Sequence, residues 1–137
     1  YYERAHLNHI LAHQNPETGM FTYMMPLMSG TAREFSSPDN DFWCCVLSGI
    51  ESHSKHGDSI YWESDDTLFV NLYIPSKLNW ASQKAAFELN TKYPYEGNIA
   101  FKVSQLSGAK TFTVALRIPG WASSSKIRNL LAPPCKW

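Results

Sequence analysis

The spacing of apolar residues divides the chain into a helical first half and a strand-rich second half. Residues 1–14 lack glycine and proline and place apolar side chains at helical intervals. This predicts a helix that ends at Asn15-Pro16, because a residue before proline is pushed out of the α region. A second helix is predicted from Val46 to about Tyr61. The residues that recur there at steps of three and four, as one face of a helix, are Val46, Ile50, His53, Gly57 and Ile60. The candidate caps upstream are Asp39, Asn40 and Asp41.

The connection between these helices, residues 15–40, carries three prolines and two glycines. Such a composition predicts a long irregular segment, with one short extended piece at residues 20–25. A loop of this length in a compact chain is more often functional than idle.

After residues 63–66 the period of the apolar residues changes from 3.6 to 2. The alternation predicts four strands with turn residues between them, at residues 68–74, 87–93, 99–103 and 112–118. This pattern is typical of an antiparallel sheet with one buried face, most simply part of a β-sandwich. We therefore expect an α + β chain with two domains, residues 1–64 and 65–137, that meet at Asp65-Asp66.

Composition narrows the classes of partner. The 137 residues include 12 basic and 12 acidic side chains, without a basic block, which argues against nucleic acid and an anionic membrane surface as main partners. No apolar run approaches the roughly 18 residues of a membrane span, and the charged opening does not resemble a signal peptide. Because the chain lacks an initiator Met and opens in what reads as mid-helix, we expect a piece of a longer polypeptide. The sequence does not indicate the cellular compartment.

Two adjacent cysteines, Cys44 and Cys45, stand at the start of the second predicted helix. A helix N-terminus favours the thiolate, and two neighbouring thiolates can share a soft metal such as zinc. The alternative is a pair of inert core cysteines beside Trp43, since free cysteine is among the most buried residues. The pattern leaves both interpretations open, and Cys135 belongs to neither.

The five histidines carry similar alternatives. His6, His9 and His13 can share one face of the first helix, where they would hold a metal or contact a ligand, or form a plain polar face. His53 lies on the apolar stripe of the second helix and fits a core histidine, with His56 three residues later.

Other polar and aromatic residues near the cysteines are also ambiguous. Glu51 stands about two helical turns after Cys44, where it would orient a group near the cysteines or pair with Lys55. Tyr23 and Trp43 would stack on a sugar ring or fill a core.

Several blocks of sequence resemble one enzyme group. They are Asp41-Phe42-Trp43-Cys44-Cys45, Pro16-Glu17-Thr18-Gly19-Met20-Phe21-Thr22-Tyr23, Gly49-Ile50-Glu51-Ser52-His53, Lys55-His56-Gly57-Asp58-Ser59-Ile60-Tyr61, Asn71-Leu72-Tyr73-Ile74-Pro75-Ser76 and Leu116-Arg117-Ile118-Pro119-Gly120-Trp121. Over roughly residues 1 to 128 the chain resembles the bacterial β-L-arabinofuranosidase-like enzymes of glycoside hydrolase families 127 and 146. The double cysteine in this setting is the most specific of these features.

The resemblance implies an (α/α)6 barrel followed by β-sandwich domains, in a retaining glycosidase whose cysteine nucleophile is held on zinc. Residues 1–64 would form the last helices of the barrel, and residues 65–137 the start of a sandwich. By similarity, Cys44 would be the nucleophile and a zinc ligand, Cys45 a second zinc ligand, and Tyr23 and Trp43 contacts to a carbohydrate substrate.

Three departures from the family qualify this interpretation. The remaining zinc ligands, a Glu and a Cys, and the general acid/base Glu lie upstream of the helix that opens this chain. The rest of the barrel is thus an expected partner in cis, and the isolated chain is expected to be inactive. Leu47 replaces a small residue and is expected to crowd the helix start, and residues 129–137 read as an aberrant end.

Two other interpretations stay open. The chain would be a non-catalytic carbohydrate-binding or assembly module that uses exposed Tyr73, Trp80 or Tyr95, or a degenerate gene product that does not fold.

Overall fold

The first helix runs without interruption to His13, as the absence of glycine and proline predicts. It begins as α1, Tyr2–Ala5, continues as the π-helical η1, His6–Ile10, and ends as the 3-10 turn η2, Leu11–His13. The backbone is extended at Gln14, so the predicted stop before Asn15-Pro16 is confirmed.

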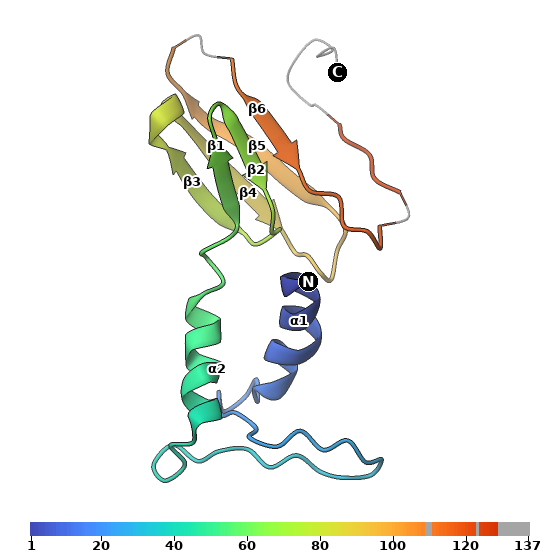
Figure 1. The fold of residues 1–137 in the computed structure, drawn as a ribbon. Helices are drawn as coiled ribbons and strands as arrows, with labels where there is room; N and C mark the ends of the chain where they lie inside the picture. Colours follow the sequence, from blue (N-terminus) through green and yellow to red (C-terminus); the bar gives the residue numbers. More distant parts are fainter. Residues whose placement is uncertain (109–110, 123, 129–137) are drawn as a thin grey trace. The chain divides into compact units, whose positions relative to one another are not determined.

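The computed structural model describes residues 1–108, 111–122 and 124–128. The chain divides into two compact units, Tyr1–Ile60 and Tyr61–Trp137, which are drawn in Figure 1. Cys135 and the predicted aberrant end lie outside the described residues. Within the described part of the chain, every helix is too short or too polar to cross a membrane.

The second helix, α2, spans Cys44–Ser54, so the predicted extension to about Tyr61 is wrong. The chain leaves the helix where Lys55 and Asp58 form an ion pair of 3.6 Å across a turn, and the next residues enter a strand. The predicted caps Asp39, Asn40 and Asp41 are wrong as well, since the N-cap is Trp43, with extended backbone and no side-chain cap.

The predicted apolar stripe of α2 is also incorrect. Ile50 is 56 % exposed, and the buried position of the helix is Gly49. The face of the helix that packs against its own unit carries Gly49 and His53, and His56 follows just beyond the end of the helix.

The second unit contains two three-stranded sheets rather than one sheet of four strands. One sheet has the order β1, Tyr61–Ser64, β2, Thr67–Val70, and β6, Thr113–Leu116. The other has the order β3, Ser76–Trp80, β4, Ala85–Thr91, and β5, Ile99–Leu106, with the 3-10 turn η3, Ala81–Gln83, between its first two strands.

The strand pairing corrects the expected wholly antiparallel sheet. β2 pairs with β6 in parallel, whereas the other pairs are antiparallel. The chain leaves β2, builds the whole second sheet and then returns beside β2 in the same direction. β1 and β3 were not predicted, because each has few alternating apolar residues.

Asp65 and Asp66 form the turn of the β1–β2 hairpin, with Ser64 paired to Thr67. Asp65 has a φ of 53°, which short polar residues tolerate best after glycine. The predicted boundary at these residues therefore falls inside the second unit, which begins at Tyr61.

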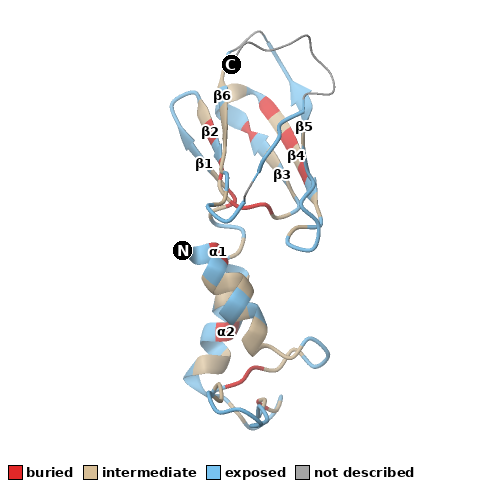
Figure 2. Ribbon diagram, turned by 90° about the vertical axis from the view of Figure 1, so that its right-hand side faces the viewer, coloured by how far each residue is buried: buried red, intermediate tan, exposed pale blue. Residues whose placement is uncertain are grey.

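The core of the second unit draws on both sheets. Leu68 of β2 clusters with Trp80, Ala85 and Phe87 of the β3–β4 hairpin, and Figure 2 shows the buried positions along β4. Residues of β4 alternate between buried and partly exposed, so the period of two in the sequence identified the buried face correctly.

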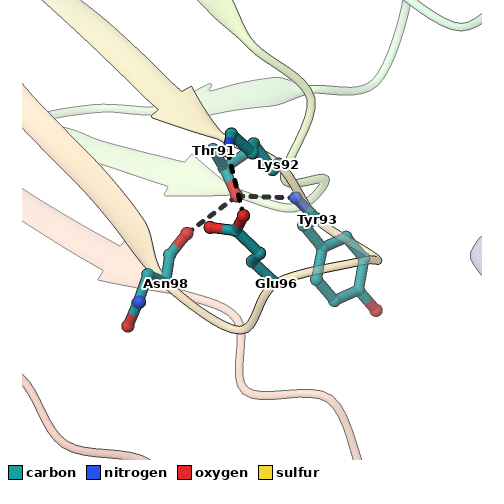
Figure 3. A network of polar contacts seen from close by, with 5 residues as sticks. All are labelled: Thr91, Lys92, Tyr93, Glu96 and Asn98. Carbon is teal, nitrogen blue, oxygen red and sulfur yellow. Dashed lines mark hydrogen bonds and ion pairs between the residues drawn. The ribbon is translucent and has the colours of Figure 1, made fainter.

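The turn between β4 and β5 is closed by polar contacts (Figure 3). The Thr91 hydroxyl donates to the Asn98 carbonyl at 2.9 Å and accepts from the Tyr93 amide at 3.0 Å. The Lys92 ammonium pairs with Glu96 at 3.0 Å. The predicted turn after the second strand is confirmed.

Candidate functional site

The irregular connection before α2 is anchored at Phe21. The Phe21 amide donates to the Ser36 hydroxyl at 3.1 Å, and the Ser36 amide donates to the Phe21 carbonyl at 2.8 Å. Phe21 also bridges to Gln14 at the end of the first helix. These bonds bring the two ends of a long loop together and fix its course on the helical unit.

Phe21 lies directly against the backbone of α2. A Cβ atom added to Gly49 would stand 2.6 Å from the Phe21 ring, closer than real side-chain contacts come. Phe21 is 4 % exposed, so its ring has little room to move. Glycine is therefore required here by close packing.

Replacing Gly49 by alanine is expected to lower the free energy of unfolding by about 1–3 kcal/mol, because the added methyl forces the Phe21 ring or the helix to shift. Thermal unfolding of the whole chain, followed by circular dichroism, measures the loss. Gly57→Ala is the matched control, since its Cβ would meet no atom within 4 Å. Equal melting of the two variants would contradict the close packing.

The segment that leads into α2 is held by Asp41. Its carboxylate accepts from both the hydroxyl and the amide of Ser37, each at 2.7 Å. The hydroxyl bond, and next the amide bond, lower the pKa of Asp41. The predicted capping residue therefore caps the preceding loop instead of the helix, and fixes the approach to Cys44.

Cys44 and Cys45 occupy the first turn of α2, with their sulfur atoms 3.8 Å apart. Cys44 is exposed and Cys45 is half-buried, and both are free thiols. The alternative of two buried core cysteines does not fit the exposed Cys44. Burial, followed by the Cys44 thiol, raises the pKa of Cys45, so without a metal this thiol keeps its proton at neutral pH.

The sulfur separation fits two corners of a zinc site. A tetrahedral ion with Zn–S bonds of about 2.3 Å holds two sulfurs about 3.8 Å apart, and the cysteines already have this spacing. Among the described residues, however, no three His, Cys, Asp or Glu side chains gather at a common point. The residues present therefore fit half of the ligand set.

Two aromatic side chains stand beside the cysteines. Tyr23 of the irregular connection contacts Trp43 edge-on, with ring centroids 5.6 Å apart, and Trp43 directly precedes Cys44. Both rings keep more than a third of their surface exposed. The fold thus brings Tyr23 from the connection to Trp43, which directly precedes the cysteine pair, so all four predicted site residues lie on neighbouring segments.

The histidines are distributed differently from the predicted single face of the first helix. His9 stacks against His13, whereas His6 packs against His56 with ring centroids 4.0 Å apart. The sequence offered a weak signal for this contact, namely histidines at helical spacing on each of two helices. It did not indicate which histidines face one another.

Two family models match the sequence of the chain. The β-L-arabinofuranosidase GH127 catalytic domain matches residues 1–58, and the GH127 middle domain matches residues 67–129. The chain belongs to glycoside hydrolase family 127. The two matched ranges fall on the two compact units, one on each. A search of curated proteins finds no match.

Membership of family 127 confirms the resemblance drawn from the sequence and supports a glycoside hydrolase. In this family 127 chain, Tyr23, Trp43 and the cysteine pair all lie in the range that matches the catalytic domain. Leu47 is 61 % exposed, so it does not crowd the described start of α2 as expected.

The interpretation as a binding module expects exposed rings at Tyr73, Trp80 or Tyr95 of this family 127 chain. Trp80 is 4 % exposed and donates its indole N–H to Glu63. Tyr73 is also buried and donates to the Arg117 carbonyl. Of the three aromatics predicted to be exposed, Tyr95 alone is, so the prediction is wrong for the other two.

Proposed function

We propose that this chain supplies the nucleophile and two zinc ligands of a retaining glycoside hydrolase that cleaves β-L-arabinofuranosides or related sugars. The observation that carries the proposal is the exposed cysteine pair, with sulfurs 3.8 Å apart at the start of a helix in the range matched to the GH127 catalytic domain. The helical unit would be the end of an (α/α)6 barrel, and the two sheets part of a β-sandwich.

Cys44 is the better nucleophile of the two, because its sulfur is exposed while Cys45 is half-buried. Its sulfur would form a bond to the anomeric carbon as the glycosidic C–O bond breaks, and the leaving oxygen would take a proton from an acid/base residue. Water would then release the sugar with overall retention, since two inversions restore the configuration.

Cys44 and Cys45 would hold zinc, which keeps a bound thiol deprotonated near neutral pH. The remaining ligands and the acid/base residue would come from another part of the protein, because no third ligand joins the cysteines among the described residues. Tyr23 and Trp43 would orient the sugar ring against the sulfur, as exposed aromatic faces do for carbohydrates.

A mass-spectrometric trapping experiment tests the proposal. The catalytically complete protein is mixed with an aryl β-L-arabinofuranoside, quenched in acid and digested. The peptide that contains Cys44 is expected to gain one sugar residue. The 137-residue chain alone is the control, with no labelling and no hydrolysis expected. A sugar attached to a carboxylate instead, or hydrolysis by the chain alone, would contradict this division of roles.

A further inference from the structure

Three imidazole rings and one phenol gather between the two helices of the first unit. The Tyr2 hydroxyl lies 2.8 Å from His56 Nδ1, and His56 Nε2 lies 3.0 Å from His53 Nδ1. The His6 ring stands over His56, with centroids 4.0 Å apart. We refer to Tyr2, His6, His53 and His56 as the histidine cluster.

The histidine cluster joins segments that are distant in sequence. Tyr2 and His6 come from the first helix, whereas His53 and His56 come from the end of α2 and the turn after it. The hydrogen bond between the Tyr2 hydroxyl and His56 Nδ1 links the first helix to the turn that follows α2. The cluster is therefore a specific polar contact between the two helices.

The hydrogen bonds of the histidine cluster limit how many protons it accepts. Only one proton fits between His56 Nε2 and His53 Nδ1, which face each other at 3.0 Å. Among the described residues, His6 Nδ1 and His53 Nε2 are buried and have no hydrogen-bond partner. If His53 and His56 were both protonated, two N–H groups would therefore face each other. Protonation of His6 would place charge near a buried nitrogen that has no hydrogen-bond partner among the described residues.

The charged groups around the cluster offer limited compensation. Glu3 favours a positive charge on His6. Asp58 faces Tyr2 but is paired with Lys55. From the irregular connection, the neutral Phe21 ring packs against His53. Neighbouring imidazoles and burial therefore dominate over the one nearby carboxylate.

We propose that the histidine cluster is an acid-sensitive contact, which holds the first helix against α2 while its rings are neutral and releases it when they are protonated. It lies at the end of α2 away from the cysteines, and it is independent of the proposed catalytic role.

The direction of the pH effect follows from the proton affinities. Burial lowers the pKa of His6 and of His56 from the ordinary 6.5, and the neighbouring imidazoles lower both further. The unfolded chain consequently binds more protons than the folded chain below about pH 6.5. Stability is fully present above that pH, and it is lost as the pH falls through the lowered values.

Thermal unfolding of the full chain at about pH 7.5 and about pH 5.5, on either side of the ordinary histidine pKa, tests the proposal. We expect Tm of the helical signal to be lower at the acidic pH. His56→Gln keeps a hydrogen-bonding side chain without the charge. In this variant, the difference in Tm between the two pH values is expected to be at most about half of that in the unmodified chain. His9→Gln is the control: His9 is exposed on the first helix, outside the histidine cluster, and its replacement should leave the drop in Tm unchanged.

Proton NMR titration of the histidines in the unmodified chain provides a second measurement if a variant does not fold. His6 and His56 are expected to titrate below the ordinary histidine pKa of about 6.5, and to influence one another. Separate, ordinary titrations of all these rings would overturn the proposal, as would an equal drop in Tm for His56→Gln and the unmodified chain.

Discussion

Replacing Cys44 by alanine in the catalytically complete enzyme is expected to lower kcat by about three orders of magnitude or more, as loss of a catalytic nucleophile does. The variant keeps Cys45, but that sulfur is half-buried and cannot take the place of the exposed one. Binding of the sugar should change little, because Tyr23 and Trp43 remain. Steady-state kinetics and a binding titration separate the two effects.

Cys135→Ala is the matched control for loss of a thiol, and it should keep the turnover of the unmodified enzyme. If Cys44→Ala also kept full turnover while the sugar still bound, Cys44 would not be the nucleophile, and a non-catalytic binding or assembly role for this chain would become the better interpretation. Loss of both turnover and binding would instead indicate a collapsed site, and the Gly49 and Phe21 packing would be the first place to examine.

Replacing Phe87 by alanine is expected to lower the free energy of unfolding of the strand unit by about 3–5 kcal/mol, since it removes a large buried ring. Phe87 is 1 % exposed. Its ring stacks on Phe101 with centroids 4.9 Å apart, and meets Phe112 edge-on at 5.8 Å. Phe87 lies in β4, Phe101 in β5 and Phe112 directly before β6, so the loss of the ring removes contacts among three segments of the core.

Chemical denaturation monitored by Trp fluorescence measures this change, because Trp80 packs against Phe87. Tyr95→Ala is the control, an aromatic of similar size that is 94 % exposed, and should stay within about 0.5 kcal/mol of the unmodified chain. A chain without any cooperative transition would favour the degenerate gene product that does not fold.

The local elements were largely predictable from sequence, and the long-range ones were not. Alternation placed β4 and its buried face correctly, because a half-buried strand imposes a period of two on its own residues. Nothing local marks β1: Tyr61 stands at the end of the predicted second helix, and β1 forms through pairing with β2. The parallel return of β6 is likewise decided by where the intervening sheet lies.

The candidate site shows the same limit. The adjacent cysteines were evident in the sequence, but their exposure and their 3.8 Å spacing depend on how the loop before α2 is fastened. That fastening uses Ser37 with Asp41 and Phe21 with Ser36, pairs that no periodic pattern reveals. The histidine cluster was missed for the same reason. Tyr2 and His6, like His53 and His56, have an ordinary helical spacing, and the sequence does not show that the two pairs contact each other.

The parallel pairing of β2 with β6 also has a consequence for the order of events during synthesis. β3, β4 and β5 are joined by short turns and can assemble as soon as they leave the ribosome, whereas the β1–β2 hairpin must wait until Leu116 has emerged. An isolated two-stranded hairpin is marginally stable, and its open edge is available to other chains. A nascent chain stopped before β6 therefore exposes β2 as a site for aggregation or for binding by chaperones, and β6 is the strand that covers this edge.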